Sequence, residues 1–82
     1  MNRVKEFGRV VRKWRRARGF TQEKLAELAN LHVNSISLIE RGLVPPTLDS
    51  ILLIADALGV KVSDLVDEME AAADKSNFIE ES

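Results

Sequence analysis

Cysteine and tyrosine are absent from this 82-residue sequence, and histidine occurs once. The absence of cysteine excludes disulfides, thiol catalysis and cysteine metal ligands. A single histidine, His32, cannot form a cluster of metal ligands or a catalytic dyad, and the carboxylates follow helix surfaces without a convergent pair. We therefore expect no enzyme, no metal site and no cofactor.

Long hydrophobic runs are missing as well. Met1 is followed directly by a charged, patterned segment, so the sequence predicts neither a signal peptide nor a membrane span, and we expect a cytoplasmic protein. The length suits one small domain that is held together by hydrophobic packing alone.

Helical periodicity is present along most of the chain. Val4, Phe7, Val11 and Trp14 recur at the spacing of one helical face, which predicts a helix over about residues 4–17. No strand pattern interrupts the sequence, so the expected fold class is all-α with five helices.

Two short helices, at about residues 22–29 and 33–41, are predicted next, with Thr21 as an N-cap, Asn30 in a left-handed turn and Gly42 as the final cap. The apolar residues of their shared seam are Leu25, Ala26, Ala29, Leu31, Ile36 and Ile39. Two such helices joined by a tight turn form a helix-turn-helix unit, whose second helix enters the DNA major groove. The sequence therefore predicts a protein that binds double-stranded DNA.

A fourth helix is expected to begin at Thr47 or Asp49. The apolar stripe of this helix consists of Leu48, Ile51, Ile54, Ala55 and Leu58. Ser63 is expected to cap a last helix that covers at least residues 64–69, with an extension through Ala73 left open.

Charges are unevenly distributed, although the formal net charge is only -1. Residues 1–20 contain eight basic residues and one acidic residue, whereas residues 68–82 contain five acidic residues and one basic residue. We interpret residues 1–67 as the DNA-binding domain, and residues 68–82 as a C-terminal helical extension and acidic tail kept away from nucleic acid. A solvated helix face is the alternative for a charge run taken alone.

Rotation along the third helix separates its buried and outward sides. A step of about 100° per residue places Ile36 and Ile39 together toward the core. The outward side carries Asn34, Ser37, Leu38 and Arg41, with Val33 and His32 at its leading end. We expect this side to meet DNA; the alternative is an ordinary polar surface with one stray leucine.

Base reading is expected at four of these positions. Asn34 can pair bidentately with adenine, and Ser37 can donate or accept a hydrogen bond. Val33 and Leu38 can pack against thymine methyl groups.

Contacts to the DNA backbone are expected from a second set of residues. His32 and Arg41 flank the base-reading residues, and Arg41 could also read a guanine. Gln22 lies at a helix N-terminus that favours a phosphate, with simple capping as its alternative role. Arg12 and Arg16 supply positive charge from the first helix.

The sequence resembles the Cro/C1-type, or XRE, helix-turn-helix domain of phage repressors and small bacterial regulators over about residues 4–66. The resemblance is carried by Val11, Trp14, Arg15, residues 18–22, Leu25, Ala26, residues 36–42, Pro46 and residues 55–60. It implies a compact, lambda repressor-like fold with an ion pair between Arg15 and Glu40. It also implies a phosphate contact at Gln22 and base contacts at the four positions named above.

Among short members of this family, the chain looks most like the controller proteins of restriction-modification systems, which are dimeric regulators of their own operons. A helix-turn-helix domain alone reads few base pairs, so we expect a homodimer on a palindromic or pseudo-palindromic operator. The expected dimer interface comprises Leu53, Ala57, Val66 and Met69, with Phe78 and Ile79 as further surplus apolar residues. The alternative is an antitoxin-like regulator whose acidic tail binds a protein partner and for which DNA binding is secondary.

Overall fold

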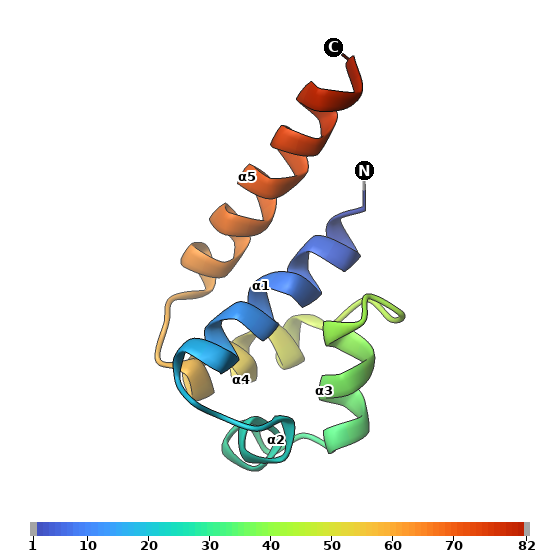
Figure 1. Ribbon diagram of the computed structural model, residues 1–82. Coiled ribbons are helices and arrows are strands. Elements are labelled where there is room, and N and C mark those ends of the chain that lie inside the picture. The colour runs from blue at the N-terminus through green and yellow to red at the C-terminus, as the bar shows by residue number, and fades with distance from the viewer. Residues whose placement is uncertain (1, 82) are drawn as a thin grey trace.

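The computed structural model describes the backbone of residues 2–81 and the side chains of residues 2–73. The described backbone contains five helices and no strand, which confirms the expected fold class. The helices are α1 (Arg3–Ala17), α2 (Gln22–Ala29), α3 (Val33–Glu40), α4 (Leu48–Leu58) and α5 (Val62–Glu81). In Figure 1, α1 crosses the centre, α2 and α3 lie together at one end, and α5 runs beside α1. Both termini lie at the end away from α2.

The turn between α2 and α3 has the predicted conformation. The Thr21 side chain caps α2 by accepting a hydrogen bond from the Lys24 N–H at 3.0 Å. Asn30 closes α2 in the left-handed region, with φ 56° and ψ 44°. Gly42 follows α3 with φ 69°, so it supplies the predicted left-handed cap. These local signals place α2 and α3 as a compact helix-turn-helix unit.

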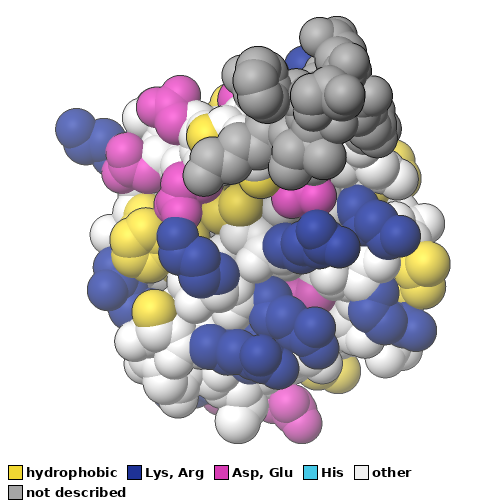
Figure 2. Space-filling view, turned by 45° about the horizontal axis from the view of Figure 1, so that its top comes forward, with side chains coloured by type: hydrophobic (Ala, Val, Ile, Leu, Met, Phe, Trp, Pro, Cys, Tyr) yellow, Lys and Arg dark blue, Asp and Glu magenta, His cyan; other side chains and the backbone are white. Residues whose placement is uncertain are grey.

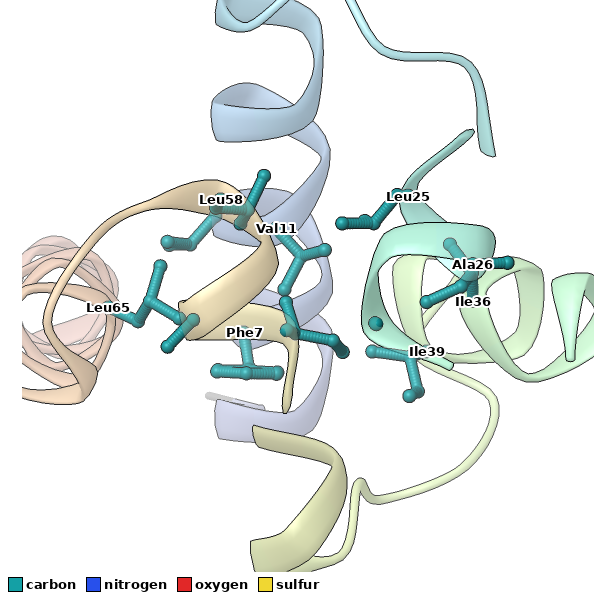
Figure 3. Packing of buried hydrophobic residues seen from close by; sticks show 12 residues of the cluster. Phe7, Val11, Leu25, Ala26, Ile36, Ile39, Leu58 and Leu65 are labelled. Carbon is teal, nitrogen blue, oxygen red and sulfur yellow. The ribbon is translucent and has the colours of Figure 1, made fainter. Parts of the chain in front are cut away.

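All five helices contribute to one hydrophobic core (Figure 3). Its fully buried large side chains are Val11, Leu25, Ile36, Ile54, Leu58 and Leu65. Trp14 and Phe20 pack against this cluster while keeping part of their surface exposed. The buried Ile36 and Ile39 anchor one side of α3, which leaves its other side for solvent or a ligand.

Gly8 permits a close contact between α1 and the end of α3. A Cβ atom at this position would lie 2.2 Å from the Ile39 carbonyl oxygen and 2.7 Å from that of Glu40. Both are backbone atoms, so a side chain at residue 8 would force the two helices apart. The missing side chain therefore lets Glu40 reach the surface of α1.

Three expectations about α4 and α5 are corrected or extended. Leu48 is 68% exposed and lies outside the core, because it precedes the part of α4 that packs against other helices. Ser63 does not cap α5, since the helix begins at Val62 and the Lys61 carbonyl accepts the first backbone bond, from the Asp64 N–H. The helix also continues beyond Ala73. Phe78 and Ile79 lie outside the described side chains.

None of the helices in the described part of the chain combines the length and hydrophobicity needed to cross a membrane.

We predict that Gly8→Ala lowers the free energy of unfolding. Overpacking costs about 1–3 kcal/mol, which should exceed the gain of roughly 1 kcal/mol from the higher helix propensity of alanine. Urea denaturation followed by circular dichroism measures the difference. Arg9→Ala, at the exposed neighbouring position of α1, is the control and should change stability by less than about 0.5 kcal/mol. A more stable Gly8→Ala protein would contradict the close contact.

Candidate nucleic-acid interface

The N-terminal half of α3 presents the most accessible of the predicted base-reading residues. Asn34 is exposed, and Val33 is 39% exposed despite its apolar side chain. Ser37 is half-buried one turn later. The rotation expected from the sequence is therefore observed for Val33 and Asn34, at the start of α3.

Leu38 is less outward than the rotation predicts. Its side chain is half-buried and lines a cleft together with Val44, Pro45 and Pro46 of the following connector. The Leu38 carbonyl also accepts a hydrogen bond from the Leu43 N–H at 3.0 Å. The connector therefore folds back beside Leu38 and supplies the apolar partner that the sequence left unidentified.

His32 and Arg41 lie at the two ends of α3, and both side chains are exposed. His32 occupies the N-cap position without a side-chain capping bond. Its carbonyl accepts the backbone N–H groups of Ser35 and Ile36 instead. Both His32 and Arg41 thus remain accessible beside the exposed face of α3.

Arg15 and Glu40 form a buried ion pair that joins α1 to the end of α3, as the family resemblance implied. The Arg15 Nε lies 2.6 Å from Glu40 Oε2, and Nη2 lies 3.0 Å from Oε1. Arg15 Nη1 donates a third hydrogen bond to the Phe20 carbonyl. The hydrogen bond with Glu40 raises the pKa of Arg15 above its ordinary value, although burial acts in the opposite direction. Arg15 is therefore a structural cation.

Two residues expected to contact the DNA backbone approach the same carboxylate. Gln22 Nε2 donates a hydrogen bond to Glu40 Oε1 at 3.1 Å, and Arg12 Nε lies 3.8 Å from that oxygen. The Glu40 side chain is only 1% exposed, whereas that of Arg12 is 51% exposed. Simple capping is therefore not the role of Gln22, because Thr21 caps α2 and the Gln22 amide turns toward Glu40.

Most other basic residues of α1 have partners within the chain. Lys13 pairs with Glu68 of α5, Arg3 pairs with Glu70 at 3.0 Å, and Arg9 pairs with Glu6 at 3.1 Å. Arg18 donates to the Leu58 carbonyl at 2.8 Å and lies over the Trp14 ring. Figure 2 shows Lys and Arg side chains gathered on one face of the molecule. Within the described residues, Lys5 and Arg16 are exposed on α1 without an ion pair.

The expected separation of the basic and acidic ends is wrong for the first two acidic residues of the tail. Helix α5 packs along α1, so Glu68 and Glu70 lie beside α1 and neutralise part of its charge. Trp14 Nε1 also donates to Glu68, at 2.5 Å. Burial alone would raise the Glu68 pKa, but the hydrogen bonds from Lys13 and Trp14 outweigh it and lower the pKa below its ordinary value.

The residues expected at a dimer interface differ in accessibility. Leu53 is 38% exposed on α4, and Val66 of α5 is half-buried. Ala57 and Met69 pack against the core of their own chain and present only part of their surface. Leu52, which the sequence did not single out, is exposed beside Leu53 and widens the apolar surface of α4.

Several long-range pairings escaped the sequence reasoning, and two of them matter most for the site. The Lys13–Glu68 pair joins residues 55 positions apart, and the Gln22–Glu40 bond joins residues 18 positions apart. No periodic pattern links such positions. The one available signal was Trp14, whose partly buried indole N–H requires an acceptor.

Comparisons with known proteins cover the same helices. A helix-turn-helix family model matches residues 11–65. The control protein C.BamHI of Bacillus amyloliquefaciens is 47% identical over 62 residues, which are 74% of this chain and 76% of that protein. The immunity repressor of Bacillus phage phi105 is 39% identical over 61 residues, covering 74% of this chain but only 42% of the repressor.

A solved structure is similar as well. The restriction-modification controller protein C.AhdI from Aeromonas hydrophila has a TM-score of 0.74 at 35% identity, covering 76% of this chain and 94% of the controller. The matched regions include α2 and α3, the helices that form the candidate interface.

We predict that the stabilising effect of Glu68 disappears in acid. Because its pKa is lowered in the folded protein, its contribution is complete above the unfolded-state pKa and is lost as the pH falls through the folded-state pKa. The measurement is the difference in unfolding free energy between the wild type and Glu68→Gln across an acid titration. Fluorescence of Trp14, the single tryptophan, reports the transition. A difference that persists unchanged in strong acid would contradict this role.

Proposed function

Because the chain belongs to the XRE-type helix-turn-helix family of DNA-binding transcriptional regulators, we propose that it binds a palindromic or pseudo-palindromic operator as a homodimer. The observation that carries the proposal is the exposed start of α3, held over the core by Ile36 and Ile39. A helix presented in this way can enter the major groove with its N-terminal residues against base edges.

Base reading is assigned first to Asn34 and Val33, which are the most accessible. Asn34 can bond adenine N6 and N7 together, and Val33 can contact a thymine methyl group. Ser37 and Leu38 lie nearer the middle of α3 and are half-buried, so they are less accessible to bases. Their contribution depends on how deeply the helix inserts.

Backbone contacts are assigned to Arg12, Arg16, Gln22, His32 and Arg41. Arg16 and Arg41 are exposed, and Arg12 keeps half of its side chain accessible beside Glu40. Such contacts set affinity and register without reading sequence. Their positions on α1, α2 and both ends of α3 would surround the base-reading residues.

The dimer is assigned to α4 and α5, with Leu53 and Val66 as central residues and Ala57 and Met69 beside them. Large apolar side chains that are exposed together mark an interaction surface more often than isolated ones. Leu52 and Leu53 form such a pair on α4. A two-fold axis at this surface would present two copies of α3 to half-sites about one helical turn apart.

Similarity to C.BamHI and C.AhdI supports a controller that regulates its own restriction-modification operon. Selection of bound sites from random DNA would give both the half-site and its spacing. A symmetric selected site that also occurs in the promoter of the chain's own operon supports the proposal, whereas asymmetric selected sites that are absent from this promoter contradict it. The antitoxin-like alternative is less favoured, because Glu68 and Glu70 are already paired with α1.

We predict that Asn34→Ala weakens binding to the selected site by about 1–3 kcal/mol and leaves binding to random DNA nearly unchanged. Arg16→Ala is the matched comparison, since it removes charge without removing a base contact. It should weaken binding to both DNAs and reduce the slope of log K against log salt by about 0.9 per lost phosphate contact. Fluorescence anisotropy on the two duplexes at several salt concentrations measures both effects. Equal losses on both DNAs for Asn34→Ala would remove its base-reading role.

We predict that Leu53→Asp converts the dimer into a folded monomer, because a buried charge without a partner opposes association. Sedimentation equilibrium measures the molecular mass, and circular dichroism verifies the fold. Leu28→Asp is the control, because Leu28 is similarly exposed, at 46%, but lies on α2. That variant should remain dimeric. A dimeric Leu53→Asp protein would exclude this face of α4.

A further inference from the structure

We propose that Glu40 is a positioning residue for DNA binding, which orients the Gln22 amide and the Arg12 guanidinium toward one stretch of DNA backbone. This inference rests on the backbone contact proposed for Gln22 above, and it adds a role to Glu40 beyond its ion pair with Arg15. The inference is based on one oxygen at the end of α3, which side-chain donors from both α1 and α2 approach.

The geometry around Glu40 divides its two oxygens between separate tasks. Oε2 accepts the shorter bond, 2.6 Å from Arg15 Nε, which holds α1 and α3 together. Oε1 accepts from Arg15 Nη2 at 3.0 Å and from Gln22 Nε2 at 3.1 Å, and it lies 3.8 Å from Arg12 Nε. One buried atom therefore faces three side chains, of which only Arg15 is itself buried.

The bond to Glu40 determines which part of Gln22 remains available. An amide nitrogen has two N–H donors. One of them points to Oε1, so the second N–H and the amide oxygen remain for another partner. Gln22 is also the first residue of α2. The backbone N–H groups of Lys24 and Leu25, in the first turn of this helix, are already bonded to Thr21. The remaining amide donor thus lies beside a helix N-terminus, where an anion is favoured.

Arg12 is held in the same way but more loosely. Its Nε lies within ion-pair distance of Oε1, whereas half of its side chain is exposed. The guanidinium has further N–H donors that Glu40 does not use. A carboxylate that restrains both side chains before DNA arrives reduces the conformational entropy they lose on binding.

A consequence for recognition follows from the position of Glu40 in the chain. It is the last residue of α3, the helix that presents Asn34 to the bases. The donors aimed at the DNA backbone are therefore fixed relative to the reading helix itself. A shift of α3 would move the base-reading and backbone-binding groups together.

A double-mutant cycle between Glu40 and Gln22 tests the inference. Binding of wild type, Gln22→Ala, Glu40→Gln and the double variant to a random-sequence duplex is measured by fluorescence anisotropy at fixed salt. In the wild-type background, Gln22→Ala should weaken binding about fivefold, the worth of one hydrogen bond. In the Glu40→Gln background the same change should cost less than about twofold, because the one remaining acceptor oxygen is neutral and Arg15 competes with Gln22 for it. A purely structural Glu40 would not change the effect of Gln22→Ala.

Arg16→Ala is the control in both backgrounds. Among the described residues Arg16 makes no ion pair with Glu40, so its effect should be the same with and without the carboxylate. If Gln22→Ala costs equally in both backgrounds, the positioning role of Glu40 is overturned and the backbone contact of Gln22 stands. If Gln22→Ala has no effect even in the wild-type background, the contact itself is absent and the inference falls with it.

Two further measurements test the inference even if Glu40→Gln fails to fold. Glu40→Asp keeps the negative charge near Arg15 but withdraws it by one methylene, and it should also reduce the effect of Gln22→Ala. Gln22 is the only glutamine in the chain, so its side-chain amide signals in NMR are identifiable in the unaltered protein. We expect one of its two protons to exchange with water more slowly than the other. Equally rapid exchange of both protons would overturn the proposal.

Discussion

The buried carboxylate of Glu40 joins the helices that carry the proposed DNA-binding surface. It reaches α1 because Gly8 has no side chain and lets the end of α3 contact the α1 backbone. There it meets Arg15, which also bonds the Phe20 carbonyl in the segment leading to α2. Removing one partner of a buried pair typically costs about 3–5 kcal/mol, because the other charge is left uncompensated. The relative positions of α1, α2 and α3 therefore depend on a small polar contact within an otherwise apolar arrangement.

The basic residues of α1 divide into those that are paired within the fold and those that stay accessible. Arg15 is buried in its ion pair with Glu40, and Lys13 and Arg3 pair with carboxylates of α5. On α1, positive charge remains accessible at Lys5, at Arg16 and, beside Glu40, at Arg12. The protein thus presents a cationic surface to a polyanion despite a net charge of -1, since local charge and not the total determines the attraction at close range. Helix α5 confines that charge to the side of α1 that it leaves uncovered.

Local sequence signals were sufficient for the helices and for the exposure of Val33 and Asn34 at the start of α3. Caps such as Thr21, Asn30 and Gly42 act through neighbouring backbone atoms, so their effect is readable within a few residues. Rotation about Ile36 likewise predicts the exposure of Asn34. The half-buried state of Leu38 was not predictable in this way, because it depends on where the 43–46 connector folds. The exposed state of Leu48 was missed because helical periodicity alone does not show where α4 begins to pack against other helices. The Gln22 and Lys13 pairings depend on tertiary distances that periodicity does not contain.

Helix α2 connects α3 to α4 within the core. It packs against both α3 and α4, whereas α3 and α4 are joined in sequence only by the connector that contains Pro45 and Pro46. In the proposed dimer the two-fold axis lies at α4 and the bases are read by α3. The distance between the two reading helices would then depend on the core contacts that join α3 to α4 through both α2 and α1. Because a packed core resists compression and expansion alike, this route keeps the spacing of the two half-sites nearly constant. The packing of α1 and α2 against α3 and α4 would thereby limit which operators the dimer can span.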